Sequence, residues 1–208
     1  MNKKLVAVSI ATSVILALGA CSSIPSQNPG KKIVDASQGH RPDWIDTPIE
    51  NKNGKHWFVG TSTNASDETL ARDEAKAYAE AEVAESIRID IHKYLNSARS
   101  DDSANADDYN HDTEHAIEDG VLTQSRAVMT GFHVKKYYWV EYTLNGKPHL
   151  FRDEYVLAWM SDADYNQTVN LTFEKEQKVI QDKRARHILK FMKKHYLNSD
   201  GNEPASKN

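Results

Sequence analysis

Hydrophobic and polar positions alternate over 56–63, and this period of two predicts a strand. Three of its side chains share one face: Trp57, Val59 and Thr61. A helical pattern follows, because Ser66 is a typical N-cap residue and the acidic residues after it suit a helix N-terminus. The helix is rich in alanine, and its predicted stripe consists of Leu70, Ala77, Ala81 and Ala84. Small side chains in that stripe would let the helix lie close to a sheet.

The segments after this helix carry weaker patterns. Polar residues separate three isoleucines, which predicts a strand directly after the helix: Ile87, Ile89 and Ile91. The stretch 97–112 is rich in Asp, Ser and Asn, and we expect it to be a mobile acidic loop. A second, shorter helix is predicted behind the loop, although Gly120 weakens it. Its apolar positions are Ile117, Val121, Leu122 and Val128.

A β-hairpin is the clearest local prediction. The segments 132–142 and 149–160 both alternate, and Asn145-Gly146 between them is typical of a type I′ turn. In the second strand, one face carries Phe151, Tyr155, Leu157 and Trp159, with Asp153 as the exception.

A long helix is predicted to end the domain. Ser161 and Asp164 resemble a capping box in which Asp replaces the usual Glu. We expect a continuous helix from Asp162 to His195, with its charged middle, 174–186, projecting into solvent or toward a partner. Five apolar side chains lie near one face of it: Val169, Phe173, Ile180, Ile188 and Met192.

The order of these elements predicts one α+β domain over 41–197. It would consist of a small sheet with an N-terminal strand, an Ala-rich helix, a C-terminal β-hairpin and a long C-terminal helix, packed in two layers. The preceding residues, 21–40, are rich in Ser, Pro, Gly and Asn and are predicted to form a flexible tether. The last residues, 198–208, are predicted to be a polar tail.

Residues 1–20 have the pattern of a lipoprotein signal peptide. Two lysines precede an apolar stretch, 5–18, which is too short to cross a bilayer as a mature helix. The following Leu18-Gly19-Ala20-Cys21 resembles the lipobox that prolipoprotein-processing enzymes recognise. The resemblance implies that Cys21 Sγ receives a diacylglyceryl group, that the chain is cut before Cys21, and that the new amino group is acylated with a fatty acid such as palmitate. The alternatives are a secretory signal with an incidental cysteine, and a cysteine buried in an N-terminal hydrophobic helix.

Composition agrees with a lipid-anchored envelope domain. The whole chain has 26 basic and 30 acidic residues, so removing the two lysines of 1–20 leaves 24 and 30, a net charge of −6. That balance argues against a nucleic-acid partner.

Cys21 is the only cysteine, and two or three acyl chains there would hold the protein in the bilayer almost permanently. Ser22, where an Asp would be a retention signal, resembles the outer-membrane sorting signal, so we expect a periplasm-facing lipoprotein of the outer membrane.

Three motifs resemble the Lpp-twenty family of bacterial lipoproteins. They are Pro42-Asp43-Trp44-Ile45, Trp57-Phe58-Val59-Gly60-Thr61 and the alanine series Ala71, Ala75, Ala79 and Ala81. The resemblance covers about 41–160. Members of the family include outer-membrane lipoproteins required around the flagellar motor, in a disk or ring at its base. It therefore implies a structural or assembly role and brings no catalytic signature.

Motifs for catalysis and for cofactors are missing from the sequence. It has no GxSxG elbow, no SxxK, no phosphate-binding glycine loop and no second cysteine, so we expect neither an enzyme nor a cofactor. Adjacent carboxylates such as Asp153 and Glu154 point to opposite faces of a strand and cannot flank one bond together. His111 and His115 are weak zinc candidates at helical spacing, and we interpret their surroundings as a solvated polar segment.

Aromatic residues of the hairpin leave two function classes open. Rings on both sheet faces would come from Tyr137, Tyr138, Trp139, Tyr142, Tyr155 and Trp159. The second face is either covered by the C-terminal helix or exposed as a contact surface for a partner or polysaccharide. The favoured class is a non-enzymatic envelope component that packs against itself or other envelope proteins, through an exposed sheet edge or helix face. The alternative is a periplasmic binding module for a small ligand or glycan.

Overall fold

The computed structural model describes residues 30–47, 49–101, 111–145 and 147–193. Its elements, in chain order, are β1 (Lys31–Ala36), the 3₁₀ turn η1 (Asp43–Ile45), β2 (Lys55–Ala65), α1 (Glu68–Asp101), α2 (His111–Val128), β3 (His133–Leu144), β4 (Leu150–Ser161), α3 (Asp162–Val179) and α4 (Lys183–Met192). The predicted α+β class is confirmed. The signal peptide 1–20, Cys21 and the tail 198–208 lie outside the described residues.

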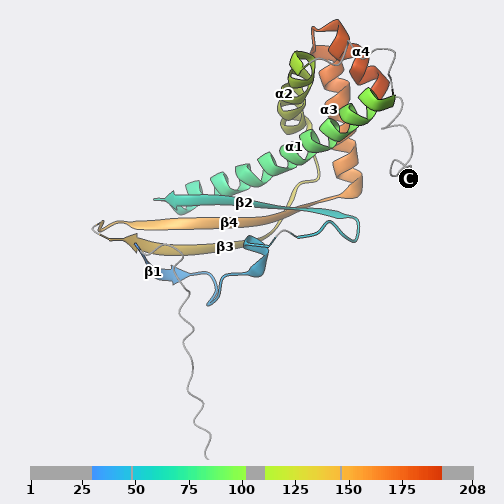
Figure 1. The fold of residues 1–208 in the computed structure, drawn as a ribbon. Helices are drawn as coiled ribbons and strands as arrows, with labels where there is room; N and C mark the ends of the chain where they lie inside the picture. The colour runs from blue at the N-terminus through green and yellow to red at the C-terminus, as the bar shows by residue number, and fades with distance from the viewer. Residues whose placement is uncertain (1–29, 48, 102–110, 146, 194–208) are drawn as a thin grey trace, which may run out of the picture.

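The four strands form one antiparallel sheet in the order β1-β3-β4-β2 (Figure 1). The β3–β4 hairpin is confirmed and occupies the centre, whereas β1 and β2 are the edges. The tip at Gly146 lies outside the described residues. Helix α1 runs beside β2, and α2, α3 and α4 gather with the end of α1 beyond one end of the sheet.

Helix α1 packs against the sheet through a row of small residues. A Cβ added to Gly60 of β2 would overlap the Ala75 carbonyl oxygen and lie 2.8 Å from Ala79 Cβ. Seven buried positions of α1 recur every four residues, at Ala71, Ala75, Ala79, Val83, Ile87, Ile91 and Leu95, and Ala84 of the predicted stripe is buried beside them. Alanines lie where the helix covers the sheet, and larger side chains follow where it joins the other helices. Residue size along α1 therefore matches the space that each part of the helix has to fill.

The predicted register of this helix was wrong in three respects. Its N-cap is Asp67, whose Oδ1 accepts the Leu70 amide at 3.0 Å, and not Ser66. Leu70 and Ala77 of the predicted stripe are exposed. No strand follows at 87–91, because Ile87 and Ile91 lie four residues apart on the buried side of a continuing helix, while Ile89 is 44% exposed.

Two predicted loops are partly structured. Lys31–Ala36, within the predicted flexible tether 21–40, pairs with β3 as strand β1. The Lys31 ammonium is 2.7 Å from the Asp153 carboxylate of β4, and this long-range ion pair favours the strand over a free tether. Of the predicted mobile loop 97–112, the start belongs to α1 and the end to α2, while 102–110 lies outside the described residues. The predicted second helix is confirmed as α2.

The predicted C-terminal helix is two helices. Ser161 caps α3 as expected, because its Oγ accepts the Asp164 amide at 3.0 Å. The helix ends at Val179, and Asp182 Oδ1 then accepts the Arg184 and Ala185 amides as the N-cap of α4. The chain turns there, so the charged middle 174–186 does not simply project into solvent. Residues of that middle are buried at Glu176, Ile180 and Ala185.

We expect Gly60→Ala to lower the free energy of unfolding by about 3 kcal/mol or more, because the methyl group would overlap the backbone of α1. Gly39→Ala is the matched control, since nothing lies within 4 Å of a Cβ at that position. It should change stability by no more than about 0.5 kcal/mol. Urea unfolding followed by circular dichroism measures both. Equal stability of the two variants would contradict the close approach.

Candidate functional site

The two edges of the sheet differ in how well they are protected against pairing. Strand β1 has six residues, carries Lys31, Lys32 and Asp35, and has a bulge. Strand β2 has eleven residues, pairs with β4 in regular register from Lys55 to Ser62 before a bulge near its end, and has no charged side chain from Trp57 to Ala65. Short length, charge and bulges are the usual means of blocking an edge. Among the described strands none pairs with the outer edge of β2, so this edge is long and open.

The direction of the backbone groups on β2 follows from one hydrogen bond. The Trp57 amide donates to Asn51 Oδ1 at 3.2 Å, outside the ladder with β4. Because amides in an antiparallel pair alternate between the two sides of a strand, those of Val59 and Thr61 point the same way as that of Trp57. The N–H and C=O groups of these two residues therefore face the open edge.

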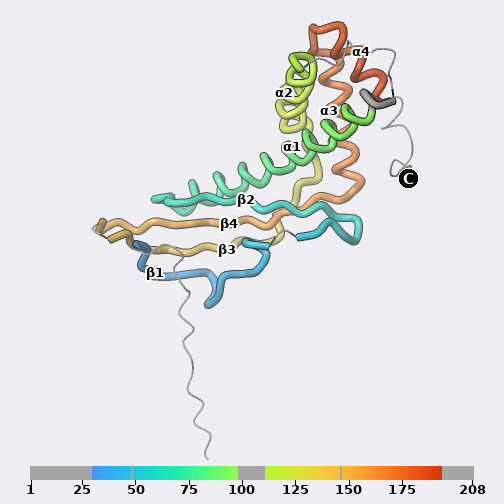
Figure 2. Tube along the Cα trace, in the orientation of Figure 1, coloured from blue at the N-terminus to red at the C-terminus, as the bar shows by residue number. Residues whose placement is uncertain are grey.

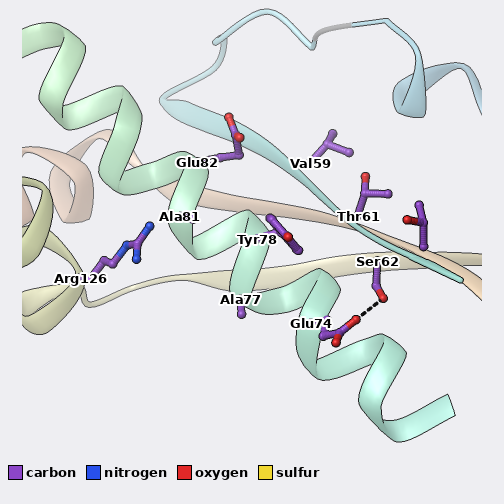
Figure 3. Close-up of a pocket in the computed structure, with 10 residues that line it drawn as sticks. Val59, Thr61, Ser62, Glu74, Ala77, Tyr78, Ala81, Glu82 and Arg126 are labelled. Carbon is purple, nitrogen blue, oxygen red and sulfur yellow. Dashed lines mark hydrogen bonds between the residues drawn. The ribbon is translucent and has the colours of Figure 1, made fainter. Parts of the chain in front are cut away.

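A groove of about 670 Å³ lies between this edge and α1 (Figure 3). Its strand wall is Val59 with Thr61–Thr63, and Arg126 of α2 lies at one end. Its helix wall consists of Glu74, Ala77, Tyr78, Ala81 and Glu82. We call this space the β2 groove. The small Ala77 and Ala81 leave room there, and Tyr78 is 60% exposed.

The position of the β2 groove is fixed by the packing of α1 on the sheet. Gly60 brings the helix down onto the sheet, and this places every fourth residue of the adjoining flank toward the edge: Glu74, Tyr78 and Glu82. The Ser62 hydroxyl donates to Glu74 Oε2 at 2.6 Å, which ties strand and helix together at one end. The helix wall thus carries two carboxylates, those of Glu74 and Glu82, and one guanidinium, that of Arg126, lies at the end of the groove.

A smaller hollow of about 250 Å³ continues along the same edge. It is lined by residues 44–47, 49, 57 and 58, and it shares Val59 and Glu82 with the β2 groove. The two spaces together follow the edge from Trp57 to Thr63.

The aromatic face of the sheet is buried by the N-terminal segment. Trp44 and Ile45 pack against Tyr138, Val140 and Tyr155. In Figure 2 this segment passes the sheet on the side away from α1. The C-terminal helix, which the sequence favoured as the cover, packs with the other helices instead.

Partly exposed rings on the strands are covered by cations. Arg72 stacks over Tyr137 with its guanidinium 5.4 Å from the ring centre. The other three pairs are Lys55 over Trp159, Lys135 over Trp57 and Arg152 over Trp139. These contacts stabilise the sheet surface and occupy one face of each ring.

Asp153 and Glu154 have separate roles, as the strand alternation predicts. Asp153 Oδ1 accepts the Tyr142 hydroxyl and the Asn64 amide, which fixes the bulge at the end of β2. Glu154 is fully buried beneath α1 and accepts Arg152 Nε at 2.8 Å. Burial raises the pKa of Glu154, opposed by the charge of Arg152. Each carboxylate is held by structural partners.

The two candidate metal ligands come together at the start of α2. His111 Nε2 and His115 Nε2 are 3.0 Å apart, and both side chains are exposed. In the part of the chain that the structure describes, no group of three or more His, Cys, Asp or Glu is arranged to hold a metal ion. The pair therefore stands alone there, without a third ligand.

Sequence reasoning placed Val59, Thr61, Ala77 and Ala81 on predicted elements but did not identify the residues of the β2 groove as a site. Two signals point to them in retrospect: a strand of eleven residues with an uncharged centre, and polar or aromatic residues at every fourth position of α1. Neither signal identifies a groove without the strand order, which places β2 at an edge.

Comparisons with known proteins give no further assignment. A scan against protein-family models found no match, and searches of curated proteins and of solved structures found none. Each helix within the described ranges is too short or too polar to span a bilayer.

One buried carboxylate lies away from the groove, among the helices. Glu176 of α3 is 3% exposed and faces Gly120 of α2, where any Cβ would collide with the carboxyl group. Its Oε2 has no hydrogen-bond partner among the described residues. Burial raises the pKa of Glu176 above its ordinary value of 4.5. Ionisation of this group therefore opposes folding.

We expect Glu176→Gln to raise the free energy of unfolding at pH 7 by about 1 kcal/mol or more. A carboxyl whose pKa is raised by folding stabilises the fold fully below its unfolded pKa of about 4.5, and loses that contribution as pH rises through the folded value. The gain should therefore shrink as pH falls toward 4. Urea unfolding at several pH values measures it.

Glu174→Gln is the control for this measurement. Glu174 is exposed, and the nearby Lys193 lowers its pKa. The control should bring no gain at pH 7, and an equal gain in both variants would contradict the role of burial.

Proposed function

We propose that this chain is a non-enzymatic lipoprotein of the outer membrane, attached through acylated Cys21, whose body binds another envelope protein as a structural or assembly component. The observation that carries the proposal is the open edge of β2 with the β2 groove beside it. Unpaired N–H and C=O groups on a long edge are a ready template for another chain. The lipobox-like sequence at 18–21 supports the attachment.

The arrangement of the sheet suits a tethered docking protein. The described chain begins beside β1, at one edge, whereas the open edge is β2 at the other. Two strands therefore separate the point where the anchor segment enters from the docking edge. A partner could reach β2 without contact with the attachment side.

The resemblance to the Lpp-twenty family adds a place around the flagellar motor to the proposal. Each of the three motifs has a packing role in the structure. Gly60 of the second motif lies against Ala75 and Ala79 of the third, and Trp44 of the first covers the opposite face. Together the motifs build the body that presents the edge.

A ligand-binding module fits these observations less well. The aromatic rings that could form a sugar platform are either buried under Trp44 and Ile45 or already stacked with a cation on one face. The β2 groove instead combines backbone groups with a helix wall, and such a surface suits a protein partner.

We expect Cys21→Ser to lose incorporated radioactive palmitate and to leave the outer-membrane fraction, because the acyl chains supply the attachment. Ser22→Asp should keep the palmitate and move to the inner-membrane fraction. Ser23→Ala is the control and should behave as wild type. Sucrose-gradient fractionation in high salt separates these outcomes. Persistence of Cys21→Ser in the outer-membrane fraction would contradict the proposed anchor.

A further inference from the structure

The open edge of β2 specifies the form of partner that it can accept. We infer that the partner contributes an extended segment that adds to β2 as a further strand, with basic side chains directed toward α1. This inference rests on the proposed function, since it names the kind of protein segment that the docking body binds. The backbone of Val59 and Thr61 would form hydrogen bonds with the partner segment, and the carboxylates of Glu74 and Glu82 would bind its basic side chains.

Backbone hydrogen bonding makes a strand the best occupant. Val59 and Thr61 present donors and acceptors at the open edge, at the spacing of an antiparallel or parallel ladder. A helix has no free backbone groups along its length with which to pair them. An extended segment does, and main-chain bonds of this kind supply affinity in strand-addition complexes.

The hollows beside the edge have the length of a strand. The β2 residues that line them lie between Trp57 and Thr63, and at ~3.3 Å per residue this span is roughly 20 Å. Alternate side chains of an added strand point to opposite faces. One set would meet the flank of α1 at Tyr78, and the other would turn toward the segment at Trp44.

Charge decides which side chains fit the helix side. Glu74 lies next to Ser62 and Glu82 lies near Val59, so the two carboxylates follow the edge. They are eight residues apart on α1, roughly 12 Å. Residues at positions i and i+4 of a strand share a face and lie roughly 13 Å apart. Two lysines or arginines at that spacing would each meet one carboxylate.

A second copy of this chain fits the same edge less well. Antiparallel pairing of β2 with its copy, about a two-fold axis perpendicular to the sheet, keeps both α1 helices on the same face. The two flanks with Glu74 and Glu82 would then face each other, and like charges would oppose the contact.

A peptide pool tests the inference. Heptapeptides with lysine at the first and fifth positions, and Val, Ile, Thr, Ser or Tyr elsewhere, are incubated with the full chain in a neutral detergent. We expect retained peptides to bind with Kd below about 1 mM by fluorescence anisotropy. The matching pool with glutamate at those positions should be retained at least tenfold less.

N-methylation of the peptide tests the hydrogen bonds without altering the protein. For a retained peptide, two analogues are N-methylated on complementary sets of alternate amides. One set faces β2 and the other faces solvent, so one analogue should lose at least tenfold in affinity and the other should not. Equal binding of both analogues would overturn strand addition.

Proline substitution tests the protein side. Thr61→Pro removes an amide that faces away from β4 and should abolish retention. Val34→Pro places the same substitution at the bulge of the opposite edge and should leave retention unchanged. Circular dichroism checks that both variants fold.

The remaining outcomes also decide the inference. The inference is rejected if, at 1 mM peptide, the wild-type chain retains no lysine peptide more strongly than Thr61→Pro does. It is also rejected if the wild-type chain is dimeric by light scattering and Thr61→Pro makes it monomeric, because the edge would then bind a second copy. Binding in detergent does not depend on acylation, so membrane fractionation of Cys21→Ser succeeds or fails independently.

Discussion

The absence of a side chain at Gly60 is the constraint on which the rest of this structure depends. It lets α1 approach β2 until the backbone around Ala75 lies against the strand. Helix direction, the cover over one sheet face and the shape of the β2 groove all follow from that contact. A larger residue at this point would lift the helix and separate Glu74 from Ser62, whose 2.6 Å hydrogen bond closes one end of the groove.

One helix thereby serves two environments. Over the sheet its buried residues are alanines, and beyond the sheet the stripe continues with the larger Val83, Ile87, Ile91 and Leu95, which enter a core with α2, α3 and α4. The flank between Glu74 and Glu82 belongs to neither core and faces the open edge. Residues four apart thus form the buried stripe, as at Ala75 and Ala79. The residues just before them in sequence, also four apart, form the wall of the groove, as at Glu74 and Tyr78. Function is proposed for the part of α1 that packing leaves free.

Local patterns predicted the elements whose signals are local. Alternation on both sides of Asn145 was enough for the central hairpin, and Ser161 marked the start of α3. Ile87, Ile89 and Ile91 alternate as in a strand, but Ile87 and Ile91 also have the spacing of one helix face, and only the core contributed by the other helices decides between them. Strand β1 was missed because its stability comes from partners distant in sequence, such as Asp153 for Lys31. The groove could not be predicted, because whether β2 is an edge depends on strand order.

Amide hydrogen exchange of the full chain tests the open edge most directly. We expect the exchange rate to alternate along β2: slow at Phe58 and Gly60, whose amides pair with β4, and fast at Val59 and Thr61, whose amides face outward. Exchange at Val59 and Thr61 as slow as that at Phe58 and Gly60 would contradict it, because the edge would then be covered in the free protein.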